Sequence, residues 1–542
     1  MVGVPGRSGG CATCRRRKKG LILTSLGVKK CDKNTPFCGQ CVEAGLVCEG
    51  YGRHHSVWIN STYGEDRKTP SVVRTRTSGP PTITLNESLM RVTREDRYVG
   101  LYLAAFLPNG RLLSRDASYI SAAGWLKYHN GLCRSEKTLR FITLAHGLSM
   151  LATRDNDSQL KFKGVEAHRM ALQEMRKAVQ DPQRATGDGL LAAVRLFRFY
   201  EILYGAETNG PNQANPTAQI KGYYAHTEGE MALFTNRGCD RRWSEAGRYL
   251  LASGRIVSFI FSVGRRQSST FDNGPWMTIP WKDTRKSPLE ELTDIMVQIP
   301  GLLEELDIIR ASTIEKGCPK AWKNLLENCS RLERQLLAWR ITMGDDIGTY
   351  DYTQSDSNIP LPEDGRDYPV LHMSFFYWSC SIILYTTIHI AVNEANQNKV
   401  KTHCSPIPFS SPGHPNYHDE RNPTLHAHRI IHALPLSYKP HAGGYAALSS
   451  TFPLGMAVRY LLVAHLFPHE DNSGDTEYEF LQQTLSQPFM GAYIGRFINH
   501  LHKVDTPTTP LKEMPGWHGT ELRAMRWWFG PCAEIEFGEY RD

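Results

Sequence analysis

Six cysteines lie within thirty-eight residues near the start of the chain, and their spacing constrains the fold more than any other feature. They read Cys11-x2-Cys14-x16-Cys31-x6-Cys38-x2-Cys41-x6-Cys48. Each Cys-x2-Cys pair lets two thiolates converge on one metal ion from a tight turn, and four thiolates complete a closed tetrahedral zinc site. Six cysteines cannot form two separate four-thiolate sites, so two zinc ions require two bridging sulfurs. The second half repeats the pair-then-single order of the first, which favours a binuclear cluster.

The redox setting decides how these cysteines are interpreted. No apolar stretch typical of a secretory signal follows the N-terminal Met, so we expect a chain that stays in the reducing interior of the cell. Disulfides are disfavoured there, and clustered cysteines indicate metal ligands. The other seven of the thirteen cysteines are scattered singly and indicate no second cluster.

Positive charge is concentrated in the same segment. Residues 1–50 contain nine Lys and Arg against three Asp and Glu, a net charge of +6, while the whole chain carries +8. A short basic segment on a nearly neutral protein is typical of polyanion binding. A basic run by itself is more often a solvated tail, but the cysteines threaded through this one favour a nucleic-acid-binding module.

Two segments around the cysteines are informative at the level of a family. Residues 10–19 read GCATCRRRKK, and residues 31–41 read CDKNTPFCGQC. Both resemble the fungal-type Zn2Cys6 binuclear cluster family of transcription factors. The resemblance implies that the first four cysteines hold one zinc ion, and that the last three together with the first hold the other. Cys11 and Cys38 would then be the bridging ligands, and Pro36 matches the proline of the loop between the two halves.

The same resemblance implies roles for the basic residues. The helix that begins at Cys14 is expected to enter the major groove of DNA and to read a CGG triplet. Arg17 and Lys18 match the family's base-contacting positions, and Arg and Lys side chains donate well to guanine O6 and N7. Phosphate contacts, which give affinity but little sequence choice, are expected from Arg15, Arg16, Lys19, Lys29 and Lys30.

The spacing between Cys14 and Cys31 departs from the family, in which six residues separate the second and third cysteines. Here sixteen residues intervene, and removal of residues 20–29 would restore the family spacing. The extra segment, GLILTSLGVK, is apolar in a module with little core to bury it. It is either a loop extruded from the cluster or a non-coding stretch retained in the gene model. With the insertion present, the DNA-reading helix could end early, at Gly20.

Composition divides the chain into a module at residues 1–50, a linker at residues 51–84 and a body at residues 85–542. The linker is rich in Gly, Ser, Thr, Pro and Arg. It shows no sustained heptad of apolar residues, so we predict no coiled coil and a monomeric module. The oligomeric state of the whole chain stays open.

Helical periodicity dominates the body, so the predicted fold class is mostly α, with a large all-helical domain behind the small cluster. Ser287 to Glu290 reads as a capping box with Pro at the first helical position. One helical face is predicted for a run that Gly205 closes, made of Leu190, Leu191, Val194, Phe197, Tyr200 and Tyr204. Further inward-facing positions are Leu289, Leu292, Met296, Ile299, Leu302, Leu306 and Ile309, and another helix is expected at residues 456–466.

Three short patterns in the body are similar to the helical regulatory domain that follows such clusters in fungal transcription factors. They are residues 226–233 (HTEGEMAL), Arg237-Gly238 and residues 275–281 (PWMTIPW). Cys48 to Tyr51 with Trp58 is similar to the short extension that often precedes that domain. The resemblance implies a regulatory body that responds to a small-molecule effector or contacts the transcription machinery.

Three other features are given structural interpretations. Residues 373–392 contain no charged side chain, but six Ser, Thr and His residues favour a buried helix over a membrane span. The histidines and cysteine between residues 403 and 432 are interpreted as loop and surface residues rather than a metal site: His403, Cys404, His414, His418, His426, His428 and His432. Trp527, Trp528 and Phe529 are interpreted as packing residues.

The sequence therefore predicts a zinc-dependent, sequence-specific DNA-binding regulator of RNA polymerase II transcription in the nucleus, with two zinc ions per chain. We expect no enzyme, because no phosphate loop, nucleophile elbow or metalloprotease motif occurs. The alternative is a zinc-binding scaffold or ligand-sensing protein that has lost DNA reading through the insertion between Cys14 and Cys31. Double-stranded DNA with CGG-type sites is the expected partner, and no membrane is expected.

Overall fold

The structure is a computed structural model of the chain, and it describes most of a helical body and parts of the cysteine region. The described residues are 11, 13–14, 31–33, 38–46, 48, 87–207, 216–311, 318–353, 360–363, 365–397, 419–465, 484–485 and 490–505. All regular secondary structure within them is helical and none is strand, which confirms the predicted mostly α fold class. Packing divides the chain into two compact units, Met1–Ile83 and Thr84–Asp542.

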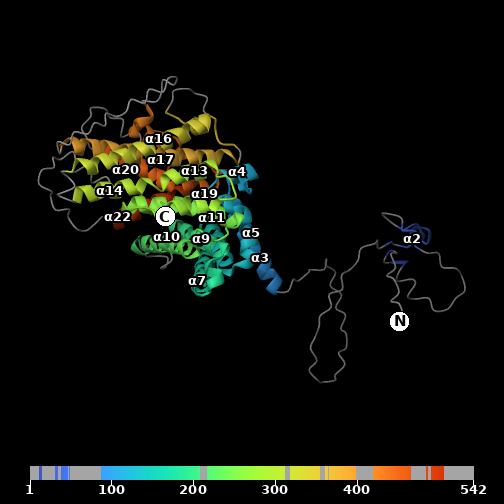
Figure 1. The fold of residues 1–542 in the computed structure, drawn as a ribbon. Coiled ribbons are helices and arrows are strands. Elements are labelled where there is room, and N and C mark those ends of the chain that lie inside the picture. Colours follow the sequence, from blue (N-terminus) through green and yellow to red (C-terminus); the bar gives the residue numbers. More distant parts are fainter. Residues whose placement is uncertain are drawn as a thin grey trace. The chain divides into compact units, whose positions relative to one another are not determined.

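Helices α2 to α11 extend from the cysteine region to the middle of the body. The smaller unit contains α2 (Gly39–Glu43). The first part of the larger unit, drawn in Figure 1, contains α3 (Glu87–Phe106), η1 (Pro108–Gly110), α4 (Arg115–Tyr119), η2 (Gly124–Tyr128), α5 (His129–Ser135), α6 (Lys137–Asp155), α7 (Ser158–Gln180), α8 (Pro182–Ala185), α9 (Asp188–Tyr204), η3 (Gly205–Glu207), α10 (Pro216–Arg237) and α11 (Glu245–Arg265).

The second part of the body continues the same all-helical packing. Its elements are α12 (Gly274–Thr278), η4 (Ile279–Trp281), α13 (Pro288–Met296), α14 (Ile299–Ala311), α16 (Pro319–Met343), η5 (Gly344–Gly348), α17 (Asp367–Gln397), η6 (Asp419–Arg421), α18 (Pro423–Ala433), η7 (Leu434–Tyr438), α19 (Gly443–Ser449), α20 (Thr451–His465) and α22 (Met490–Asp505). The predicted helix at residues 456–466 corresponds to α20, apart from residue 466, which lies outside the described residues.

Helix α9 runs through the interior of the body, where it contacts α6, α10, α11 and α22. The sequence pattern predicted a single buried face, whereas every residue from Gly189 to Tyr204 is buried. That prediction was too narrow because Arg195, Arg198 and Glu201 are buried together with the apolar residues. The predicted end of the helix is confirmed, since Gly205 follows its last residue.

Charged side chains inside the body are paired. The carboxylate of Glu230 on α10 is fully buried, forms an ion pair with Arg195 and lies 3.4 Å from the Arg198 guanidinium. Arg195 also donates to the Ser253 hydroxyl and to the Leu250 carbonyl of α11, the latter at 2.9 Å. One arginine therefore joins three helices, α9, α10 and α11.

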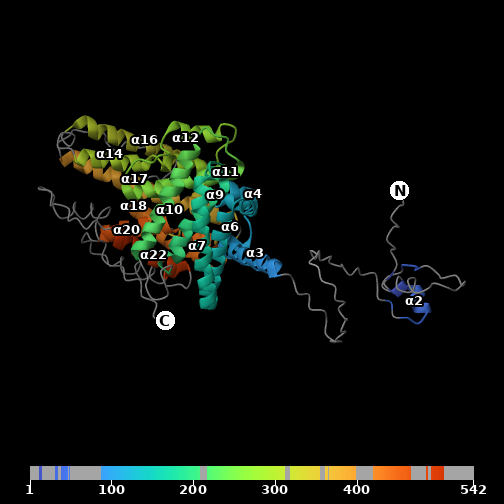
Figure 2. The same cartoon turned by 90° about the horizontal axis from the view of Figure 1, so that it is seen from below.

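Helix α17 contains the uncharged segment 373–392. It is the one helix in the described part of the chain that is long and apolar enough to cross a membrane, and 72% of its most apolar window is buried inside the body. Figure 2 shows α16 on one side of α17 and α18 and α20 on the other, and all three contact it. Its buried hydroxyls donate to carbonyls four residues earlier, as Ser379 does to Phe375 at 2.8 Å and Thr387 to Ile383 at 2.7 Å. These bonds satisfy the hydroxyls of Ser374, Ser379, Ser381 and Thr387 inside the core.

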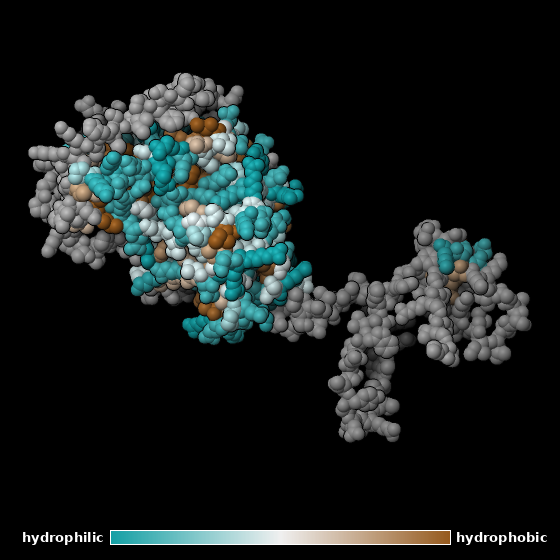
Figure 3. Space-filling view, in the orientation of Figure 1, coloured by the Kyte–Doolittle hydropathy of each residue, from teal (hydrophilic) through white to brown (hydrophobic). Residues whose placement is uncertain are grey.

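The described surface of the body is mostly hydrophilic in the view of Figure 3, with apolar residues scattered over it. The most exposed large apolar side chain is Phe162 of α7, at 72%. Single exposed apolar residues are normal for a soluble protein surface and define no binding face by themselves.

The predicted capping box is present at the start of α13. The Ser287 hydroxyl accepts the Glu290 backbone N–H at 3.3 Å, and the Glu290 carboxylate accepts the Ser287 backbone N–H at 2.7 Å. The same carboxylate accepts the indole N–H of Trp281 at 2.8 Å. The predicted inward residues of this helix and of α14 are all buried: Leu289, Leu292, Met296, Ile299, Leu302, Leu306 and Ile309.

Replacing Ser287 by Ala is expected to lower the free energy of unfolding of the body by about 1–2 kcal/mol, because it leaves the Glu290 N–H without its cap. Urea unfolding of the full-length chain measures the loss. Ser158→Ala is the matched control, since Ser158 is exposed and makes no hydrogen bond within the described residues. Equal unfolding midpoints for the two variants would contradict a stabilising role for the cap.

Candidate metal centre

Each Cys-x2-Cys pair lies at the start of a helical turn. Cys38 precedes α2, and its carbonyl accepts the backbone N–H groups of Cys41 at 3.0 Å and Val42 at 3.2 Å. Cys14 is likewise helical. Because the turn folds the second cysteine of a pair back over the first, both thiols of that pair face the same point.

Four thiols meet at that point. The ligand atoms of Cys11, Cys14, Cys38 and Cys41 all lie within 4.8 Å of one another. The Sγ atom of Cys41 is 3.6 Å from that of Cys11 and 3.7 Å from that of Cys14, and the Sγ atoms of Cys14 and Cys38 are 3.8 Å apart. A zinc ion with Zn–S bonds of about 2.3 Å separates the sulfurs of its tetrahedron by about 3.8 Å. The thiols are therefore spaced like the corners of a zinc site, and none of them is in a disulfide.

The remaining two cysteines flank this tetrad. The Sγ atom of Cys31 is 3.4 Å from that of Cys38 and accepts the Cys11 backbone N–H at 3.4 Å. Cys48 accepts the Cys38 backbone N–H at 3.3 Å. Backbone N–H groups aimed at sulfur stabilise the thiolate form that a metal requires. All six cysteines predicted as ligands are thus brought together, with Cys11 and Cys38 in contact with both halves.

The interior of the cluster is formed by sulfur. Cys11, Cys38 and Cys41 have no exposed surface, and Cys14 and Cys31 pack against them. Burial raises the pKa of the Cys11, Cys14, Cys38 and Cys41 thiols above their ordinary value. A metal ion bound here would have to displace protons from these groups, and it would supply the positive charge that offsets the four thiolates.

Asp32 is a residue of the site that the sequence analysis did not identify. Its carboxylate accepts the backbone N–H of Gly39 with both oxygens, at 3.1 and 2.9 Å. It thereby ties the third cysteine's segment to the first residue of α2, where a negative charge is favourable. An Asp directly after the third cysteine was the available signal, but nothing in the local sequence indicated that it caps a helix seven residues later.

The residues predicted to contact DNA lie outside the described residues. They are Arg15, Arg16, Arg17, Lys18, Lys19, Lys29 and Lys30. The same is true of Pro36, the insertion at residues 20–29, the linker at residues 51–84 and the aromatic residues 527–529. Their assigned roles stay predictions.

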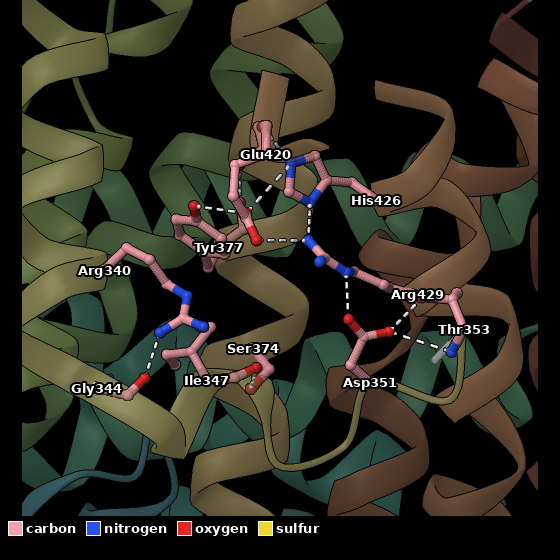
Figure 4. A network of polar contacts seen from close by, with 11 residues as sticks. Arg340, Gly344, Ile347, Asp351, Thr353, Ser374, Tyr377, Glu420, His426 and Arg429 are labelled. Carbon is pink, nitrogen blue, oxygen red and sulfur yellow. Dashed lines mark hydrogen bonds and ion pairs between the residues drawn. The ribbon is translucent and has the colours of Figure 1, made fainter. Parts of the chain in front are cut away.

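The histidine-rich segment differs from its interpretation at one residue. Residues 403, 404, 414 and 418 are outside the described residues, and His428 and His432 lie on α18. His426, in contrast, has no exposed surface and is not a surface residue. Figure 4 shows it against Glu420 and Arg429, with its Nε2 2.8 Å from the Glu420 carbonyl. Helical periodicity turns His426 toward the core, which a count of neighbouring histidines could not indicate.

The network around His426 holds four elements together. Arg429 donates to Asp351 at 2.7 Å and to Glu420 at 3.0 Å, and the Tyr377 hydroxyl of α17 donates to Glu420 at 3.1 Å. The residues come from α17, α18, η6 and the chain after η5 (Figure 4). All the ligand-like groups here are occupied by one another, so this arrangement is a structural network.

Acid is expected to destabilise the body before its carboxylates titrate. Burial lowers the pKa of His129, His146 and His426 to about 4 and of His168 and His372 to about 3. Unfolded histidine has a pKa of about 6.5, so between these values only the unfolded state takes up the proton. Stability is therefore complete above pH ~6.5 and falls as the pH drops toward ~4. Urea midpoints at pH 7.5 and pH 5 measure this, and an equal or higher midpoint at pH 5 would contradict it.

Among the described residues of the body, one cysteine–histidine contact has the appearance of a nucleophile and base. The Sγ of Cys133 is 3.4 Å from Nε2 of His129, which is 3.0 Å from the Thr143 hydroxyl. Burial raises the pKa of Cys133 to about 11 and lowers that of His129 to about 4. Both shifts favour the neutral thiol and the neutral imidazole. A catalytic thiol is instead activated by a lowered pKa.

Several residues of the body patterns noted in the sequence are packing residues. Trp276 and Trp281 are buried, and the Arg237 guanidinium lies 3.9 Å from the centre of the Trp243 ring. Thr227, Glu230 and Leu233 on α10 also face the interior.

No family model, curated protein or solved structure matches this chain.

Proposed function

We propose that this protein is a DNA-binding regulator of transcription whose six N-terminal cysteines hold two zinc ions. The observation that carries the proposal is the position of Cys11 and Cys38 between the two halves of the cluster. Cys38 lies 3.8 Å from Cys14 and 3.4 Å from Cys31, while Cys11 lies 3.6 Å from Cys41. These are the contacts that two bridging thiolates require, and they support the ligand sets that the Zn2Cys6 resemblance implies.

A single zinc ion in the tetrad is the competing arrangement. Cys14 and Cys41 belong to different ions in the bridged cluster, yet their Sγ atoms are 3.7 Å apart, close enough to share one ion. That arrangement would leave Cys31 and Cys48 without metal, although both contact the backbone of the bridging cysteines. The two-ion cluster uses all six sulfurs, and zinc stoichiometry separates the alternatives.

DNA is the proposed partner because the basic residues are concentrated in the same segment of the sequence as the six cysteines. Residues 1–50 carry +6 of the chain's net charge of +8. Zinc would fix the fold of this short segment, and the segment would then present Arg17 and Lys18 to guanine edges and its other basic residues to phosphates. The dense run Arg15 to Lys19 would also serve as a nuclear import signal.

The test is binding of the full-length chain to a duplex containing a CGG triplet, compared with a duplex in which the triplet is scrambled. Specific, zinc-dependent binding supports the proposal. A second form lacking residues 20–29 tests whether the insertion affects DNA binding. Tighter binding by the shortened form would show that the insertion obstructs DNA reading, whereas failure of both forms to prefer CGG would favour the zinc-binding scaffold.

Lys18→Ala is expected to weaken binding to the CGG duplex by about 1–3 kcal/mol and to reduce its preference over the scrambled triplet, because a base contact is lost. Lys30→Ala is the matched control, since a lost phosphate contact weakens all duplexes alike and lowers the salt slope by about one unit. Fluorescence anisotropy at several salt concentrations measures both. Uniform weakening by Lys18→Ala would remove it from base reading.

A further inference from the structure

The body contains the pattern Arg-Arg-x-Ser twice. The first copy is Arg241-Arg242-Trp243-Ser244, and the second is Arg265-Arg266-Gln267-Ser268. Protein kinases that select basic substrates recognise such arginines through acidic pockets, where guanidinium groups form charge-assisted hydrogen bonds. The two copies are equivalent as sequence, so only their surroundings in the fold distinguish them.

In the second copy, both arginines form ion pairs within the body. Arg266 is buried, has a left-handed backbone conformation with φ 51°, and forms an ion pair with Asp307. Arg265 forms an ion pair with Glu228, and the Ser268 hydroxyl donates to Glu304. A kinase could reach neither arginine without breaking an existing ion pair, and Arg266 would have to leave the core.

In the first copy, the three residues that the pattern specifies are exposed to solvent. Arg241, Arg242 and Ser244 are all exposed. Arg242 makes no ion pair or hydrogen bond within the described residues, and Arg241 makes only a long contact of 3.5 Å with the Thr186 hydroxyl. The buried residue of the copy is Trp243, which occupies the position that the pattern leaves unspecified. The backbone at Ser244 is extended, with φ −65° and ψ 166°, as a kinase substrate groove requires.

We propose that Ser244 is a phosphorylation site for an arginine-directed serine kinase that uses a nucleoside triphosphate. The Ser244 Oγ attacks the γ-phosphorus, a new Oγ–P bond forms, and the bond to the bridging oxygen of the β-phosphate breaks. The nucleoside diphosphate leaves with that oxygen, and the hydroxyl proton passes to the catalytic carboxylate of the kinase. This inference is independent of the proposed DNA binding, because it rests on the body alone.

The position of Ser244 explains what the modification would change. Its hydroxyl caps α11 by accepting the Gly247 N–H at 2.8 Å, and it donates to Asp188, the first residue of α9. Arg237 of α10 donates to the same carboxylate. The three side chains are so close to Gly247 that a Cβ there would lie 2.7 Å from the Asp188 carboxylate. Asp188 therefore joins the ends of three helices, and Ser244 supplies one of the two hydrogen bonds that its carboxylate accepts within the described residues.

A phosphate on Ser244 would replace the hydrogen bond between Ser244 and Asp188 with a repulsion. Phosphoserine has no proton to give to Asp188 and carries a charge of about −2, so the two anions repel each other. The same charge is favourable at the N-terminus of α11 and attracts the neighbouring arginines. Arg237 would then pair with the phosphate on α11 instead of Asp188 on α9, and the start of α9 would lose this ion pair with the end of α10.

The experiment is phosphorylation of the full-length chain by a purified kinase catalytic subunit specific for Arg-Arg-x-Ser, with magnesium and ATP, followed by site-resolved mass spectrometry. We expect phosphate on Ser244 and none on Ser268. Ser244→Ala should abolish it, and the double variant Arg241→Ala, Arg242→Ala should lose most of it although Ser244 remains. Arg265→Ala, the matched control in the second copy, should leave it unchanged.

Three results would overturn the inference. They are an unmodified Ser244, equal modification of Ser268, and full modification of Ser244 in the double arginine variant. Because Ser244→Ala also removes a helix cap, the double variant carries the decisive comparison: both of its arginines are exposed and lie outside any helix. A circular dichroism spectrum matching that of the wild-type chain ensures that the variant is folded.

Discussion

Removal of zinc from the full-length chain is expected to unfold the cysteine module and to leave the helical body folded. The buried residues of the module are cysteines, so in its described part sulfur takes the place of an apolar core. Structural zinc contributes on the order of 10 kcal/mol or more to such modules, which exceeds what so small a core could supply. Proteolysis should therefore become rapid before residue 84 after chelation, while the body fragment persists.

Elemental analysis tests the same cluster more sharply. We expect two zinc ions per chain, and Cys38→Ser should lose both because it removes a bridging ligand. Cys239→Ser is the matched control, a half-buried cysteine in the body that should leave the zinc content unchanged. A ratio near one would favour the single-ion tetrad. Zinc retained after Cys38→Ser would contradict both arrangements, because Cys38 is a ligand in each.

Glu230→Gln is expected to destabilise the body by about 3–5 kcal/mol, because it leaves two buried arginines without their counter-charge. The side chains of Arg195 and Arg198 are only 2% and 7% exposed, and Glu230 is the acidic partner of both within the described residues. Neither guanidinium can reach water without opening α9 or α10. Urea unfolding of the full-length variant measures the loss.

Glu228→Gln provides the control on the same helix. Its side chain is 51% exposed and pairs with Arg265, which is 50% exposed, so water screens the pair. The expected cost is about 0–1 kcal/mol. Similar midpoints for the two variants would mean that the buried cluster does not depend on Glu230 for its stability.

Local features of the fold could be predicted from sequence, and long-range ones could not. The capping box at Ser287 was readable because all of its partners lie within four residues. The end of α9 at Gly205 was readable for the same reason. The burial of Arg195 was not, because its partner Glu230 is thirty-five residues away on another helix.

The candidate site shows the same division. The convergence of the six cysteines could be predicted from their spacing, because metal ligands belong to few residue types. Asp32 was missed because its role is a helix cap rather than a ligand. His426 was misjudged because a histidine's burial depends on which way its helix faces, and the elements around α18 that cover it come from other parts of the chain.

The burial of α9 from Gly189 to Tyr204 has a consequence for how the body can change over evolutionary time. A helix with one free face accepts substitutions there at little cost, whereas each position from Gly189 to Tyr204 meets a neighbouring side chain. Drift in this segment must therefore be matched by compensating changes on α6, α10 or α11. Among diverging copies of this chain, α9 should be the segment in which single substitutions are rarest and paired ones most frequent.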